Sequence, residues 1–492
     1  MLPAPTATLT GLPPYVFSEL ERRKAAARAD GRHLVDLGIG SPDQPMAPGV
    51  VAAAQQAAAD GGCHGYPPFR GTPEFLGAAA EYLRDRFGAR LDPTRELCAV
   101  SGSKEGIAQL LAAHVGPGDV VLCPDVYYPV YARAPMLHGG EIAFLPVRAP
   151  SFLPDLDRVP ADALRRAKVL VVNYPNNPTG AVCDVAFLAR CVAFAREHGL
   201  LLVSDLAYSE LTFDGYRAPS VFEVPGARDV AVELHSCSKA FNMAGLRVGF
   251  VAGAAAAVDA LLAYRSNVGY GTPWIAQAAG AYALARHAEL ARPIAAEYAR
   301  RRDAVYSALA DAGWDVEPPR AAMYAWLPVP EGYDDWGWVE AVMLEAGVVV
   351  TPGVAFGPGG AGYFRISFVQ PPAVLAAAVA RLAGVAARGA AVGVTASAAA
   401  GTAPASTRRA SPSASPAAIV SPSPPPPTNA ASVAVATPNT AAVRTPPITT
   451  GAASGSRTSR RTCAGVMPIA WAAATAPGAA SRTPVYVART TG

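Results

Sequence analysis

The sequence predicts an α/β fold in which a mostly parallel sheet lies between helices and is joined by a smaller α+β domain. From about residue 90 to 285, short apolar runs alternate with helical patterns, as in repeated βαβ units. The runs lie at residues 120–122, 168–172, 200–203 and 230–234. Polar or turn residues follow each run, and ligands of open α/β sheets bind at the carboxyl ends of the strands. We therefore expect the functional site just after these runs.

Composition divides the chain into four parts. We predict an N-terminal arm that contributes to the small domain, a large domain, a small C-terminal domain and a low-complexity tail, at residues 1–49, 50–285, 286–387 and 388–492. The small domain should hold an Arg-rich helix and short strands, which we place near residues 298–302, 324–327, 348–351 and 363–368.

The tail is rich in Ala, Ser, Thr and Pro, a composition that buries too little apolar surface to fold, so we predict disorder. Residues 381–492 contain ten Arg and no Lys, Asp or Glu, which also fits a frameshifted reading of a GC-rich gene. Sparse arginines could contact phosphates, but few aromatic residues lie among them to stack on bases. We therefore expect no nucleic-acid partner.

Other bulk features argue against membrane, secreted and metal-binding proteins. No stretch of 18 apolar residues lacks polar interruption, and residues 1–15 show no basic segment followed by an apolar one. The seven cysteines are scattered, odd in number and form no CxxC pair. We expect a cytoplasmic protein with reduced thiols, no membrane contact and no metal site.

The segment around Lys239 is the most informative for chemistry. It reads Ser236-Cys237-Ser238-Lys239, with Arg247 eight residues further on. A lysine amine can form a Schiff base, and hydroxyl and guanidinium groups can hold a phosphate. Standing alone, the motif is weak, because a single lysine of this kind is more often a solvated surface residue and Arg247 would be an ordinary ion-pair partner.

Three further segments occur in a fixed order with Lys239. Asn173 to Gly180, NYPNNPTG, is a turn after one apolar run, and Asp205 and Tyr208 follow the next. Earlier in the chain, residues 101–106 (SGSKEG) join a predicted strand at 97–100 to a helix that begins near Lys104, where free N–H groups favour an anion.

This pattern resembles the fold-type I aminotransferases of class I and II, over about residues 10–385. The resemblance implies a seven-stranded sheet and the cofactor pyridoxal 5′-phosphate. It implies that Lys239 holds the cofactor as a Schiff base and moves protons, and that Asp205 keeps the pyridine nitrogen protonated. Asn177 and Tyr208 would hydrogen-bond the ring O3′.

The same resemblance assigns the rest of the cofactor site. The phosphate would be bound by Gly102, Ser103, Lys104, Ser236, Ser238 and Arg247, and Tyr128 would stack on the ring. The family usually has Pro-Gly before that tyrosine, whereas this chain has Val126-Tyr127, which leaves the path of this loop open. Tyr66 would reach the phosphate of a neighbouring subunit, which implies a homodimer with shared active sites.

Substrate contacts also follow from the resemblance. Arg365 would grip the substrate α-carboxylate with its planar fork, assisted by Asn177 and by the backbone at Gly40. The implied reaction is a two-stage transfer of an amino group from an amino acid to a 2-oxo acid.

Residues 12–17, 36–43, 103–106 (SKEG), 351–353 and 356–357 resemble LL-diaminopimelate aminotransferases and their close alanine and aspartate relatives. The first of these act in lysine biosynthesis, with 2-oxoglutarate as acceptor. The segment Arg265 to Gly271 departs from their Ser-Asn-Ile/Val-Asp-Ser-Gly pattern. An alanine- or aspartate-type aminotransferase and a carbon–sulfur β-lyase use the same lysine and remain open. A regulator with an aminotransferase-like sensor domain would normally need a helix-turn-helix module as well.

Overall fold

The computed structural model describes residues 2–399 and 419–420. A sheet of seven strands, in the order β4-β3-β5-β6-β7-β8-β2, forms its centre. The strands are β2 (Leu97–Val100), β3 (Val120–Pro124), β4 (Glu141–Leu145), β5 (Ala167–Val172), β6 (Leu201–Asp205), β7 (Ala231–Ser236) and β8 (Gly249–Gly253). Only β8 runs against its neighbours β7 and β2, so the predicted mostly parallel sheet is confirmed. A two-residue strand, β13 (Ile419–Val420), pairs with the β4 edge.

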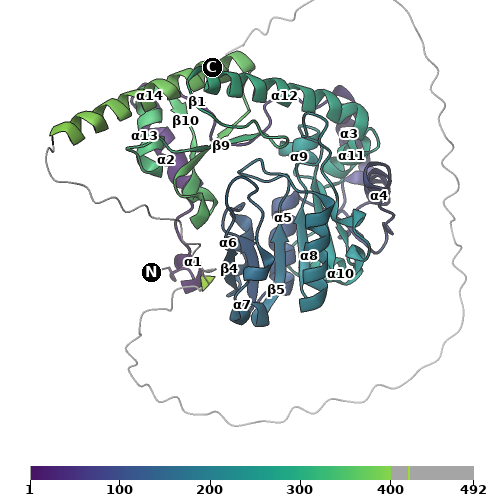
Figure 1. Ribbon diagram of the computed structural model, residues 1–492. Coiled ribbons are helices and arrows are strands. Elements are labelled where there is room, and N and C mark those ends of the chain that lie inside the picture. Colours follow the sequence, from purple (N-terminus) through teal and green to yellow (C-terminus); the bar gives the residue numbers. More distant parts are fainter. Residues whose placement is uncertain (1, 400–418, 421–492) are drawn as a thin grey trace, which may run out of the picture. The chain divides into compact units, whose positions relative to one another are not determined.

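Helices cover both faces of this sheet because its strands are apolar on both sides. Alternate residues of β3 point into different cores, with Val121 on one face and Leu122 on the other. One face is covered by α5 (Ser103–His114), α6 (Val130–Leu137) and α10 (Ala255–Val268), and the other by α7 (Ala161–Arg166) and α8 (Val185–His198). Figure 1 shows α5, α8 and α10 beside the strands. A third core, next to β2 and β8, contains residues of α3 (Pro48–Ala59), α4 (Pro73–Phe87) and α11 (Trp274–Leu284).

A second group of elements forms its own core. Residues of α2 (Val16–Ala29) and of the segment after it pack with residues 298–385. This group has the antiparallel strands β11 (Thr351–Pro352), β12 (Tyr363–Ser367) and β9 (Tyr324–Pro328), and β1 (Val35–Asp36) pairs with β10 (Val348–Val349). Its helices include α12 (His287–Asp311), α13 (Asp335–Ala341) and α14 (Pro372–Ala399). The helices α12 and α14 lie side by side (Figure 1).

The structure does not test the predicted domain limits. Residues 2–399 all belong to one compact unit, so no boundary is drawn inside them. The limits at residues 49, 285 and 387 therefore stay predictions. Helix α14 extends past residue 388, where the low-complexity tail was predicted to begin. Most of that tail lies outside the described residues. Within them, no helix is long and apolar enough to cross a membrane.

Candidate active site

A pocket of about 350 Å³ lies at the carboxyl ends of β6 and β7, beside the start of α5. Twelve of the fourteen predicted site residues line it: Gly40, Ser103, Lys104, Tyr128, Asn177, Asp205, Tyr208, Ser236, Ser238, Lys239, Arg247 and Arg365. Gly102 adjoins it through Arg247. Tyr66 does not line it, because its side chain lies 77% exposed on the surface.

Lys239 enters the pocket from α9 (Cys237–Ala240), the short helix that follows β7. Its Nζ donates a hydrogen bond to the backbone oxygen of Gly40. Burial, and then the positive charges of Arg365 and Arg247, lower the pKa of Lys239 to about 7. The amine is therefore partly neutral near pH 7, as a nucleophile and proton carrier requires.

Asp205 is the last residue of β6 and faces the same pocket. Its Oδ2 accepts a hydrogen bond of 2.6 Å from the Tyr131 hydroxyl, whereas its buried Oδ1 has no partner within the part of the chain that the structure describes. Burial raises the pKa of Asp205 to about 6, against the opposing effect of the Tyr131 hydrogen bond. A buried carboxylate oxygen without a donor is costly, so this atom is suited to a cationic N–H on a ligand.

Arg365 approaches the pocket from the other group of elements, in the central strand β12. It is 3% exposed and donates to Asn177 Oδ1 at 2.7 Å and to the Gly38 oxygen at 2.6 Å. Its guanidinium carbon lies over the rings of Tyr324 and Phe356, 4.3 Å and 4.6 Å from their centroids. Burial lowers the pKa of Arg365, and since no carboxylate of the described residues neutralises it, the group is suited to an anionic ligand.

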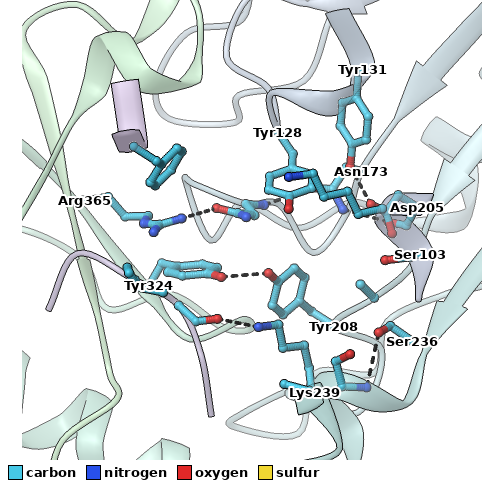
Figure 2. A pocket seen from close by; sticks show the side chains of 18 of the residues that line it. Ser103, Tyr128, Tyr131, Asn173, Asp205, Tyr208, Ser236, Lys239, Tyr324 and Arg365 are labelled. Atoms are coloured by element: carbon cyan, nitrogen blue, oxygen red, sulfur yellow. Dashed lines mark hydrogen bonds between the residues drawn. The ribbon is translucent and has the colours of Figure 1, made fainter. Parts of the chain in front are cut away.

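The two groups of elements also meet at a pair of tyrosines (Figure 2). The hydroxyl of Tyr208 lies 2.8 Å from that of Tyr324. A Cβ on Gly40 would lie 2.3 Å from the same Tyr324 oxygen. The sequence therefore needs glycine at position 40 to admit this tyrosine beside Lys239.

An anion cradle lies at the start of α5, defined by Gly102, Ser103, Ser236, Ser238 and Arg247. No side chain caps this helix, so its first N–H groups are available to a ligand. Arg247 donates to the Ser101 oxygen at 3.2 Å and to Ser238 Oγ at 3.4 Å. The cradle carries positive charge and hydroxyls, as a phosphate site requires.

Comparison with known proteins agrees with this geometry. The family model of aminotransferase class I and II matches residues 32–382. The chain is 46% identical to the LL-diaminopimelate aminotransferase of Desulforudis audaxviator, over 77% of this chain and 97% of that protein. The chain belongs to the class I and II aminotransferases.

Solved structures of other aminotransferases have the same fold. A probable N-succinyldiaminopimelate aminotransferase from Thermus thermophilus is 38% identical, with a TM-score of 0.71 over 75% of this chain and all of that one. A single mutant of the aspartate aminotransferase from the same organism is 30% identical, with a TM-score of 0.73 over 78% of this chain and all of that one. The predicted fold-type I architecture and transaminase activity are thus confirmed.

Several residues of this aminotransferase site were not predicted as site residues. They are Tyr15, Phe17, Ile39, Tyr131, Asn173 and Tyr324. Asn173 fixes the turn before Asn177. Its Nδ2 donates to the backbone oxygen of Asp205 at 2.7 Å, and its Oδ1 accepts from the backbone amide of Asn177. Its position at a strand end was a usable signal, whereas Tyr131 and Tyr324 gave none in sequence.

The loop before Tyr128, where Val126-Tyr127 replaces the usual Pro-Gly, is packed against the rest of the fold. Val126 and Tyr127 pack into hydrophobic cores, and the Tyr127 ring stacks on Phe144 at 5.3 Å. The Tyr127 amide donates to the Phe356 oxygen at 2.7 Å. Tyr128 nevertheless lines the pocket, as predicted (Figure 2).

Proposed function

We propose that this aminotransferase uses pyridoxal phosphate at Lys239, with LL-diaminopimelate as amino donor and 2-oxoglutarate as acceptor. The cofactor assignment rests on one observation. The amine of Lys239, whose pKa is low, lies in the same pocket as a carboxylate oxygen of Asp205 that has no hydrogen-bond partner among the described residues. The name of the Desulforudis relative supports the donor and a place in lysine biosynthesis.

The residues of the pocket fit this cofactor group by group. Asp205 Oδ1 would accept from the protonated pyridine nitrogen, and the anion cradle would bind the phosphate. The ring of Tyr128 would stack on the pyridine, while Asn177 and Tyr208 would contact O3′. Tyr66 would contribute to the phosphate site of a second subunit.

Each residue then has a defined task. Bound pyridoxal phosphate supplies an aldehyde that condenses with amines and a cationic ring that withdraws electrons from the substrate Cα. Lys239 would hold the cofactor through its amine and would carry the proton taken from the substrate Cα. Arg365 holds the α-carboxylate, and the negative charge of Asp205 keeps the ring nitrogen protonated.

We also propose that the protein is a homodimer and that it is located in the cytoplasm. The Tyr66 ring stacks on Tyr270 with ring centroids 4.1 Å apart, and the Phe69 ring also stacks on Tyr270, with centroids 5.5 Å apart. Tyr270 is itself 55% exposed, so these rings form an aromatic patch suited to a second subunit. The six cysteines of the described residues are free, which supports a reducing compartment.

A donor panel tests the activity and the substrate together. LL-diaminopimelate, alanine, aspartate and glutamate are assayed as donors, with 2-oxoglutarate or pyruvate as acceptor. We expect the highest kcat/KM for LL-diaminopimelate with 2-oxoglutarate. Lys239→Ala should lower kcat by about 10²–10⁴-fold or more, because it removes the proton carrier.

Two outcomes would contradict this proposal. Full turnover by Lys239→Ala would remove the assigned role of the lysine. Release of pyruvate and ammonia from cystathionine without an acceptor, at a rate above any transfer, would make the protein a carbon–sulfur β-lyase. A preference for alanine or aspartate would replace only the donor.

A further inference from the structure

The backbone of residues 36–43, which we name the glycine segment, runs through the pocket. Its Gly40 oxygen accepts from Lys239 Nζ, and Ile39 and Gly40 line the cavity. Its Gly38 oxygen accepts from Arg365 at 2.6 Å and from Thr351 Oγ1 at 2.7 Å. A shift of this segment would therefore move the hydrogen-bond partners of Lys239 and Arg365, the two basic side chains that the proposed function directs at a substrate.

The N-terminal end of the glycine segment is held by Lys24 of α2. This lysine is 2% exposed, and its Nζ lies 2.5 Å from Asp36 Oδ2 and 2.5 Å from Glu21 Oε1. The other oxygen of Asp36 accepts from the Gly38 amide at 2.9 Å. The buried Lys24 thus holds the Asp36 carboxylate, and this carboxylate holds the backbone at Gly38.

The C-terminal end is held by Arg301 of α12, which is 1% exposed. Its guanidinium forms a two-point contact with Asp43, at 2.6 Å and 3.0 Å, and its Nε donates to Glu297 at 2.8 Å. It also donates to the Phe368 oxygen at 3.0 Å. None of Lys24, Arg301 and Asp43 lines the pocket.

We propose that Lys24 and Arg301 are positioning residues that set substrate affinity by clamping the two ends of the glycine segment. The clamp acts through the Gly38 and Gly40 oxygens, which orient Arg365 and Lys239. Its effect on substrate rests on the proposed function, whereas its effect on the segment does not. Breaking one end should loosen carboxylate binding more than it slows the chemical step.

Asp43→Asn tests the clamp, and Asp214→Asn is its matched control. Asp214 receives the same two-point contact from Arg302, the next residue of α12, which is 5% exposed. Asp214 has a φ of 54°, a backbone conformation that Asn tolerates. Both variants thus lose a carboxylate from a largely buried arginine, but only Asp43 belongs to the glycine segment.

The first readout is hydrogen exchange of the peptide that covers residues 34–44, measured without cofactor or substrate. We expect Asp43→Asn to exchange there about tenfold faster than wild type and Asp214→Asn to match wild type. The second readout is the single-turnover reaction of the loaded enzyme with LL-diaminopimelate, or with glutamate where the former does not react. Asp43→Asn should raise the apparent Kd between about 10- and 100-fold, with a smaller change in the limiting rate.

If Asp43→Asn and Asp214→Asn showed the same hydrogen exchange and the same apparent Kd, the proposed clamp would be wrong. A fall in the limiting rate at unchanged Kd would also contradict it. If Asp43→Asn does not fold, Arg301→Lys, which keeps the charge but loses the two-point contact, is compared with Arg302→Lys. A wild-type enzyme inactive with every donor, together with the expected exchange difference, would refute the proposed function and leave the clamp intact.

Discussion

Lys239 combines a buried position with an environment of positive charge. Arg365 and Arg247 add to the effect of burial, so the pKa of Lys239 falls to about 7. Its one hydrogen-bond partner in the structure is a neutral carbonyl, that of Gly40, and not a carboxylate. The residue is therefore arranged to lose its proton near neutral pH. The buried Lys24 differs, because burial lowers its pKa but the two carboxylates of Asp36 and Glu21 raise it by more.

This difference predicts how the apoprotein captures its cofactor. The neutral amine is the nucleophile, so the capture rate should rise about tenfold per pH unit below pH 7 and level off above it. Stopped-flow absorbance after mixing apoprotein with pyridoxal phosphate measures this profile. A rate that continues to rise to pH 10 would show that Lys239 titrates like an exposed lysine.

At the scale of elements, the start of α5 and the loop after α9 meet at one glycine. Gly102 has a φ of 89°, and a Cβ there would lie 2.3 Å from Arg247 Nη2. Arg247 itself has a φ of 52°, so its own backbone is also held in the left-handed region. The two residues together shape the anion cradle.

Gly102→Ala should therefore weaken cofactor binding by displacing Arg247. Gly118→Ala is the control, because Gly118 has a φ of 86° but no atom within 4 Å of an added Cβ. Both substitutions strain the backbone by about 1–3 kcal/mol, which thermal unfolding should show. Equilibrium titration with pyridoxal phosphate should give a higher Kd only for Gly102→Ala. An unchanged Kd would show that Arg247 does not contribute to anion binding in the cradle.

The strands show what sequence could predict at this scale and what it could not. The apolar runs placed β3, β5, β6 and β7 correctly, but β6 and β7 continue through the polar residues Asp205 and Ser236. These residues keep the sheet pairing, at Asp205 with Leu234 and at Ser236 with Gly249. The pattern of side chains alone could not reveal this, because the pairing is made by the backbone.

At the scale of the whole molecule, the pocket collects residues from Tyr15 to Arg365. The resemblance to aminotransferases predicted most of them, since their order along the chain is characteristic. Tyr131 and Tyr324 were missed because their partners lie 74 and 116 residues away, and only the fold brings them together. The structure gives the positions of these residues, whereas their chemical roles stay predictions.

The pairing of Lys239 with the cofactor aldehyde is tested most directly by borohydride reduction of the loaded enzyme. Reduction fixes the bound cofactor to its amine, and peptide mass spectrometry then locates the pyridoxyl group. We predict the added mass on the peptide that contains Lys239, and its loss when Lys239 is replaced by Ala. A stoichiometric label on another lysine, such as Lys104 in the same pocket, would contradict the account.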